Sequence, residues 1–130
     1  TDFHPILTHH TEVRKINAER ITAQITEAAE QCERLDMPVL HKLKPLGALL
    51  AAWDGQTKIT ACLEYFDAPH ISEIPLEKNK AFIIGPAGGF EESEKKMILD
   101  YDFTQAANLG KTLLRAETAA LKALSFIDRK

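Results

Sequence analysis

The chain has 130 residues, with 16 lysines and arginines against 19 aspartates and glutamates, for a formal net charge of −3. This length suits one domain built around one core. With 45% apolar and 27% charged residues, the composition is that of a globular protein and excludes a disordered tail or a collagenous repeat. Charges of both signs are spread evenly, so the basic stripe of an autonomous nucleic-acid binder is missing.

Neither a membrane segment nor an export signal is recognisable in the sequence. No apolar stretch approaches the roughly 18 residues that span a bilayer, and the first residues lack the basic and apolar regions of a secretory signal. Cys32 and Cys62 lie far apart in no metal-ligand spacing, and we expect both to be reduced thiols in the core. These features predict a cytoplasmic protein.

Most of the five histidines fall in the first third of the chain, at positions 4, 9, 10 and 41. No cluster of cysteines or acidic ligands accompanies them in the sequence, so surface or strand-edge positions are favoured. The sequence therefore predicts no metal site.

The first part of the chain predicts a strand and two helices. Residues 3–8 form an apolar run around Pro5, which is typical of an edge strand. Residues 17–35 predict an amphipathic helix, with Asn17 as its N-cap and Pro38 as its stop. Its apolar positions recur at helical spacing: Ile21, Ile25, Ala28, Cys32 and Leu35. Residues 45–53 predict a shorter helix that begins at a proline.

The rest of the chain alternates strands with helices. Residues 58–63 alternate as a strand does, and residues 81–84 are a continuous apolar run, typical of a strand buried on both faces of a parallel sheet. A helix with an acidic start is expected from residue 91, a weaker strand over 103–109 and a helix over 117–127. The order predicts an α/β fold, with helices on both faces of a mostly parallel sheet.

A glycine-rich turn at residues 83–90 follows the apolar strand and precedes a helix. Its glycines allow the backbone to approach a ligand, and the following helix start offers free N–H groups. The motifs G-K-[ST] and G-x-G-x-x-G are absent, and Glu91 and Glu92 would repel a polyphosphate. A nucleotide-phosphate module is thus disfavoured, and a neutral or cationic ligand fits better. A tight turn without a ligand is the alternative.

A second glycine loop, over residues 109–120, leads from the last predicted strand into the final helix. It brings Arg115, Glu117 and Thr118 together near a helix start. Alone, this pattern favours capping and an exposed ion pair. Two such loops at the carboxyl ends of strands, however, form the usual ligand site of an open α/β sheet.

Three segments resemble motifs of the ribosomal RNA small subunit methyltransferase E family. Residues 84–90 resemble its I-G-P-E-G-G-F loop, and residues 109–119 resemble its L-G-x-x-I-L-R-x-E-T-A segment. Residues 27–34, with Pro38 after them, are similar to its E-A-x-E-Q-x-x-R run. Three motifs in the right order are more specific than one glycine turn, and the similarity extends over nearly the whole chain.

The resemblance implies a fold, a cofactor and a substrate. The fold would be the α/β knot of the SPOUT superfamily, with its deep trefoil knot, in a homodimer. S-adenosyl-L-methionine would bind, bent, between the two glycine loops. The reaction would methylate N3 of a uridine in 16S ribosomal RNA, which makes the small ribosomal subunit the expected partner.

The resemblance also implies site residues. The leucines would pack on the adenine ring, and backbone groups would bind adenine and ribose, at these cofactor positions: Leu63, Ile84, Gly85, Pro86, Gly88, Gly89, Leu109, Gly110, Leu113, Leu114, Ala116, Thr118 and Ala119. Because uridine N3 must lose a proton, Glu117 is the candidate base, and Arg115 and Arg34 are candidates for steering uracil oxygens or phosphate. Gln31 and Arg34 would face RNA or the dimer partner, or form a solvated helix face.

Two features depart from the family. Ala87 stands where the family more often has glutamate, which removes a carboxylate from the loop. The family also has an N-terminal PUA-like RNA-binding domain and then a first strand-helix unit, and residues 1–130 are expected to be a methyltransferase domain truncated after both. The alternative is a non-catalytic dimerisation or RNA-adaptor fragment of the same fold, whose glycine turns are only structural.

Overall fold

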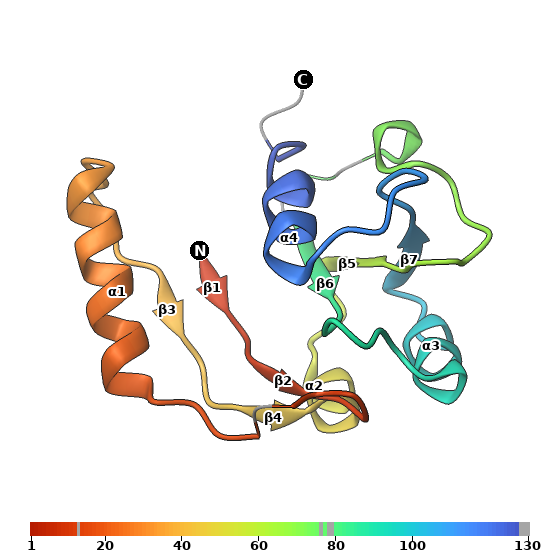
Figure 1. The fold of residues 1–130 in the computed structure, drawn as a ribbon, viewed down its shortest axis with the longest axis horizontal. Helices are drawn as coiled ribbons and strands as arrows, with labels where there is room; N and C mark the ends of the chain where they lie inside the picture. Colours follow the sequence, from red (N-terminus) through yellow and green to blue (C-terminus); the bar gives the residue numbers. More distant parts are fainter. Residues whose placement is uncertain (13, 76, 78–79, 128–130) are drawn as a thin grey trace. The chain divides into compact units, whose positions relative to one another are not determined.

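The computed structural model describes residues 1–12, 14–75, 77 and 80–127 (Figure 1). Its contacts divide the chain into two units. The first comprises Thr1–Leu7 and Glu12–Ala51, and the second comprises Thr8–Thr11 and Ala52–Lys130. Among the described residues, no helix has both the length and the apolar character needed to cross a membrane.

The first unit contains two short pairs of parallel strands. Strand β1 (Asp2–Phe3) pairs with β3 (Val39–Leu40), and β2 (Ile6–Leu7) pairs with β4 (Lys44–Pro45). The strand predicted over residues 3–8 is thus divided at Pro5, because proline has no N–H to donate to a ladder. Helix α2 (Leu46–Ala52) follows β4 and has three buried leucines, which confirms the predicted short helix. Pro45, which was expected to begin this helix, is instead the last residue of β4.

Helix α1 (Ala18–Gln31) begins where the sequence predicts. The side chain of Asn17 accepts a hydrogen bond from the Arg20 backbone N–H at 3.0 Å. The helix ends earlier than predicted, because Glu33 has a left-handed backbone with φ of 54° and turns the chain away. Leu35 lies after this turn and is exposed, and Cys32 and Ala28, which precede it, are exposed as well. The prediction that these three face the core is therefore wrong.

The second unit is built on a three-stranded parallel sheet with the order β6-β5-β7. The strands are β5 (Lys58–Cys62), β6 (Lys80–Ile84) and β7 (Thr104–Ala107). Cys62 is in register with Ile84 on one side and Ala107 on the other, so all three strands end together. The loops that follow them consequently start from one edge of the sheet.

The positions of β5 and β6 reverse the expected burial. The central strand β5 is buried continuously after its first residue, although the sequence predicted alternation. The apolar strand β6 was expected to be buried on both faces, but it lies at an edge of the sheet and only Ile83 is fully buried. A central strand has a neighbour on each side, and an edge strand lacks one.

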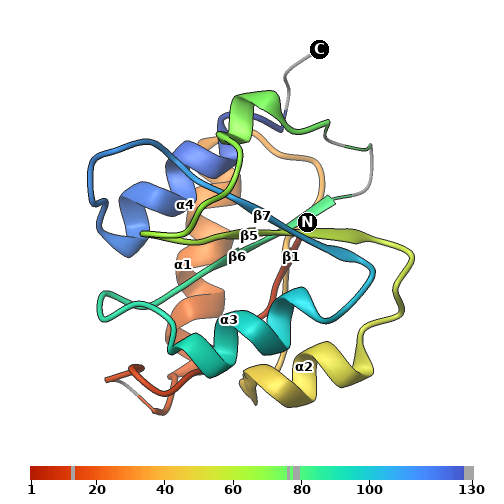
Figure 2. The ribbon, with the colours of Figure 1, turned by 90° about the vertical axis from the view of Figure 1, so that its right-hand side faces the viewer.

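Helices α3 (Glu92–Leu99) and α4 (Ala116–Leu124) lie on opposite sides of the three strands (Figure 2). Helix α3 contacts β7 and α4 contacts β6. Together with the parallel pairing, this arrangement confirms a mostly parallel α/β fold. The helix predicted over 117–127 is shorter in the structure and ends at Leu124.

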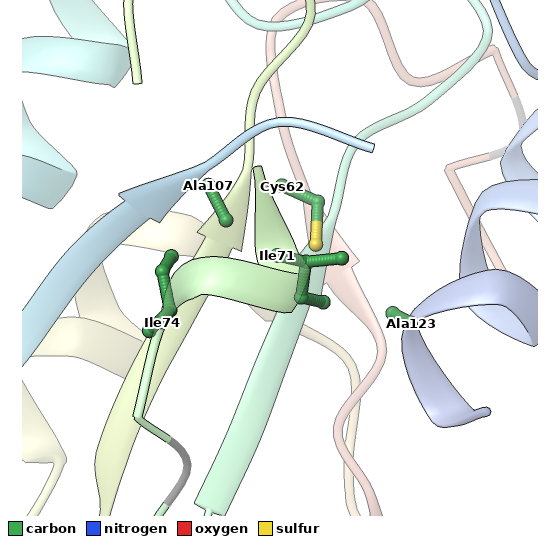
Figure 3. Packing of buried hydrophobic residues seen from close by; sticks show 5 residues of the cluster. All are labelled: Cys62, Ile71, Ile74, Ala107 and Ala123. Carbon is green, nitrogen blue, oxygen red and sulfur yellow. The ribbon is translucent and has the colours of Figure 1, made fainter. Parts of the chain in front are cut away.

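One apolar cluster joins the sheet to the elements around it (Figure 3). Its buried members come from β5, the 3₁₀ turn η1 (Ile71–Glu73) and its C-cap, β7 and α4: Cys62, Ile71, Ile74, Ala107 and Ala123. Burial of Cys62 was predicted. Because Cys62 and Ala107 are the last residues of their strands, this cluster supports the edge from which the loops leave.

Candidate functional site: a pocket at the carboxyl ends of the strands

A pocket of about 820 Å³ opens where the three parallel strands end. Its walls are residues 62–67 after β5, 84–90 after β6 and 108–114 after β7, together with His70, Lys95, Ala116 and Ala119. This volume is typical of a site for a cofactor or another small organic molecule. The two glycine-rich segments, far apart in sequence, thus form one cavity.

The first glycine loop is held close to a buried aromatic ring. The Phe90 side chain is buried, and a Cβ placed on Gly85 would lie 2.9 Å from the nearest ring carbon. Only glycine allows this approach without displacing the ring. The loop is closed by a hydrogen bond from the Gly89 N–H to the Pro86 carbonyl at 2.9 Å. Its backbone is thereby fixed at the pocket wall.

Asn108 connects the loop after β7 to the loop after β5. Its backbone N–H donates to the Pro69 carbonyl at 2.9 Å, and its carbonyl accepts from the Ile71 N–H at 3.0 Å. Its side-chain amide donates to the Ala68 carbonyl and accepts from the Gly110 N–H. Sequence reasoning missed Asn108. The available signal was an asparagine two residues before a glycine, which is typical of an Asx turn.

Acidic and strained residues line the wall that follows β5. Burial raises the pKa of Glu64, and the positive charge of Lys95 opposes that shift. Lys95 also forms an ion pair with Glu92 at 3.1 Å. The next residue, Tyr65, has a left-handed backbone with φ of 52°, which a residue with a bulky side chain rarely adopts. Carboxylates beside apolar walls suit a ligand that carries positive charge.

The predicted cofactor positions converge on this pocket with one exception. Those that line it are Leu63, Ile84, Gly85, Pro86, Gly88, Gly89, Leu109, Gly110, Leu113, Leu114, Ala116 and Ala119. Thr118 is exposed on the first turn of α4 and is outside the lining. The three loops therefore bring together residues that the sequence could only list in order.

The predicted catalytic residues lie outside the pocket lining. Arg115 is the N-cap residue of α4 and makes no side-chain cap bond, and Glu117 is in the first turn. Both are exposed and flank Ala116, which does line the pocket. The structure therefore places Arg115 and Glu117 beside the pocket, where a second substrate approaching from solvent could reach them.

Arg34 belongs to the first unit, and its guanidinium is engaged there. It pairs with Asp36 at 2.9 Å and donates to the Thr1 hydroxyl at 3.2 Å. The hydrogen bond and charge of Arg34 lower the pKa of Asp36. Gln31, the last residue of α1, is exposed.

Comparison with known proteins assigns the chain to a family. Residues 1–128 match the model of the RNA methyltransferase domain. The chain belongs to the RNA methyltransferase domain family. It is 32% identical over 129 residues to the ribosomal RNA small subunit methyltransferase E of Rickettsia conorii, covering 93% of this chain and 50% of that protein. The corresponding protein of Synechocystis sp. is 30% identical over 135 residues, with coverages of 98% and 44%.

Two solved structures share the fold of this chain. A ribosomal RNA small subunit methyltransferase E from Neisseria gonorrhoeae, bound to S-adenosyl methionine, aligns with a TM-score of 0.77 and 26% identity over 97% of this chain and 54% of that one. The protein Lpg2936 from Legionella pneumophila, solved in complex with the same cofactor, aligns with a TM-score of 0.78 and 29% identity over 95% of this chain and 53% of that one. The chain spans about half the length of the relatives that it matches.

Proposed function

We propose that this chain forms the cofactor-binding part of an S-adenosyl-L-methionine-dependent methyltransferase that acts on N3 of a uridine in 16S ribosomal RNA. The observation that carries the proposal is the convergence of two distant glycine-rich loops on one pocket at the ends of parallel strands. The relatives named as small subunit methyltransferases, and the two structures that hold the cofactor, support it.

The pocket residues fit this cofactor chemically. Leu109, Leu113 and Leu114 offer an apolar wall for an adenine ring, and the adjacent loop backbones offer hydrogen-bonding groups for its edge and for the ribose. Glu64 and Asp67 place carboxyl groups in the wall, which suits a ligand with a sulfonium and an ammonium. A polyphosphate would be repelled by the same groups.

The three predicted catalytic residues have separate proposed roles. When bound in the pocket, the cofactor would supply the methyl group of its sulfonium. Glu117 takes the N3 proton of the uridine, and Arg115 stabilises the charge that develops on the uracil oxygens. Arg34 contacts uracil or phosphate after its guanidinium leaves Asp36. All three side chains are exposed, as contact with a macromolecular substrate requires.

The proposal includes the knotted topology of the SPOUT fold and a homodimer. The three motifs shared with the family support both. Helix α4 and the turn after it also carry exposed apolar side chains, at Leu121, Leu124 and Ile127, which a second copy could cover. Light scattering on the purified chain tests this part: a mass of two chains is expected, and a monomer at every concentration contradicts it.

Calorimetric titration with S-adenosyl-L-methionine and with S-adenosyl-homocysteine tests the cofactor assignment. Both ligands should bind with a measurable heat, and Leu114→Asp should weaken both because it places a charge in the apolar wall. Leu35, an exposed leucine outside the pocket lining, provides the matched control as Leu35→Asp. No heat at millimolar ligand, together with an unchanged melting temperature and a stable dimer, would instead support the non-catalytic adaptor.

Transfer itself is tested separately, because activity can require more than the residues of this chain. Small ribosomal subunits lacking the modification are incubated with labelled cofactor, and the methylated nucleoside is identified by mass spectrometry after nuclease digestion. Glu117→Gln should lower transfer at least roughly 100-fold while leaving the calorimetric cofactor affinity unchanged. Equal transfer by the variant would remove Glu117 from the role of base.

A further inference from the structure

Two histidines and a glutamate meet in the second unit, outside the pocket. The segment Thr8–Thr11 belongs to this unit and lies against the start of α3. The Nε2 atom of His10 is 2.8 Å from Oε1 of Glu91, and Nε2 of His9 is 3.6 Å from the same oxygen. None of the three residues is part of the pocket lining.

A buried carboxylate holds the two segments in place. Glu94 is buried, and its Oε2 accepts the His9 backbone N–H at 3.1 Å while its Oε1 accepts the Glu91 backbone N–H at 2.9 Å. The backbones that carry His9 and Glu91 are thereby tied to one side chain. A turn closed by a hydrogen bond from the Thr11 N–H to the Thr8 carbonyl further shapes the first segment.

We propose that His9, His10 and Glu91 bind a divalent transition metal ion, for which Zn²⁺ is the best match. Two imidazoles and one carboxylate form a known three-ligand set for zinc, with the fourth position left to water. Ligand atoms around a tetrahedral zinc lie about 3.3 Å apart, as follows from bonds of about 2 Å. The two measured distances lie on either side of this value, and no two of the three ligand atoms are more than 4.8 Å apart.

The orientation of the rings favours convergence on one ion. The lone pair of an imidazole lies in the ring plane, and the rings of His9 and His10 meet at 83°, with their centroids 4.9 Å apart. Their side chains are 68% and 40% exposed, so each can rotate to shorten the longer separations, and an ion can enter from solvent.

A second histidine cluster provides a contrast within the same chain. Asp2, His4 and His41 lie together in the first unit, with His41 Nε2 2.8 Å from Asp2 Oδ1. The rings of His4 and His41 are stacked, with centroids 4.0 Å apart and planes 13° apart. Lone pairs in two nearly parallel planes do not meet at one point between the rings, and binding one ion would require unstacking.

Zinc titration of the full chain against a chromophoric chelator tests the site. We expect one ion with micromolar or tighter affinity, weakened roughly 100-fold by His10→Ala, by His9→Ala and by Glu91→Gln. His41→Ala, in the stacked cluster, is the matched control and should leave the affinity unchanged. Loss of binding with His41→Ala but not with His10→Ala would overturn the assignment, as would no zinc binding by the native chain at about 100 µM.

Cobalt substitution gives a second readout that does not depend on folding stability. Co²⁺ at the proposed site should show the intense visible absorption of a four-coordinate ion, which His10→Ala should abolish. Glu94→Gln replaces one acceptor oxygen by an amide nitrogen. This variant should bind zinc with about 10-fold lower affinity and show an unchanged circular dichroism spectrum. A six-coordinate cobalt spectrum in the native chain would overturn the three-ligand site, and full zinc affinity in Glu94→Gln would remove the positioning role of Glu94.

Discussion

Lys122 of α4 donates a hydrogen bond from its ammonium group to the carbonyl of Leu109, in the loop after β7. The next residue, Gly110, has φ of +117°, and a Cβ there would lie 3.3 Å from the Lys122 nitrogen. A lysine on a helix outside the sheet therefore sets the path of the second pocket loop. The bond is charge-assisted and half-buried, which makes it stronger than a bond between neutral groups at the surface.

Lys122→Met tests this bond, because methionine keeps an apolar stem of similar length and removes the donor. The free energy of unfolding should fall by about 1.5–3 kcal/mol, as expected for a bond to a charged group, and urea titration measures it. Lys96→Met, at an exposed position of α3, should change it by less than about 0.5 kcal/mol. Equal effects of the two substitutions would show that the bond to Leu109 contributes nothing.

Gly85→Ala should disturb the first pocket loop, because its Cβ would press on the buried Phe90 ring. Overpacking of this kind costs about 1–3 kcal/mol, measurable by thermal unfolding, and cofactor affinity should fall with it. The double variant Gly85→Ala with Phe90→Leu removes the clash. Its loss of stability should therefore be smaller than the sum of the losses of the two single variants. Additive losses would contradict the contact. Ala87→Ser, exposed in the same loop, is the control for the unfolding measurement.

The two cysteines should react very differently with a thiol reagent. Burial raises the pKa of Cys62 to about 12, so its nucleophilic thiolate is almost absent at neutral pH. Cys32 is exposed. Native protein should therefore be alkylated at Cys32 alone, Cys32→Ser should abolish the reaction, and denaturant should expose both sites. Mass spectrometry of the peptides identifies the site, and rapid labelling of Cys62 in native protein would contradict its burial.

Glu64 should make stability depend on pH. Because the pKa of Glu64 is raised, the folded chain holds this proton more tightly than the unfolded chain does. Stability therefore falls as the pH rises from the ordinary pKa of a glutamate through the raised pKa of the folded state. Glu64→Gln removes this loss and should stabilise the protein more at pH 7 than at pH 4, as measured by urea titration. Glu27→Gln, exposed on α1, should show no such difference. An identical effect of Glu64→Gln at both pH values would refute the cause given.

Local patterns predicted much of the fold. Asn17 marks the start of α1 because its side chain caps the helix, and the apolar run before Gly85 marks β6 because a turn must follow it. The same patterns failed for Cys32 and Leu35. Their spacing continues the apolar stripe of α1. For Leu35 the reason is that the backbone turns at Glu33, and no local signal in the spacing shows that turn.

The sequence by itself determined helices α1 to α4, strands β5 to β7, their order and the two glycine-rich segments, because capping, periodicity and turn formation depend on neighbouring residues. The tertiary structure alone decided what these segments build. Parallel registration places Cys62 beside Ile84 and Ala107, so the loops form one pocket. The tertiary structure also brings Glu91 to His9 and His10, although these residues are far apart in the chain. Such meetings result from packing between distant segments, which no short-range pattern records.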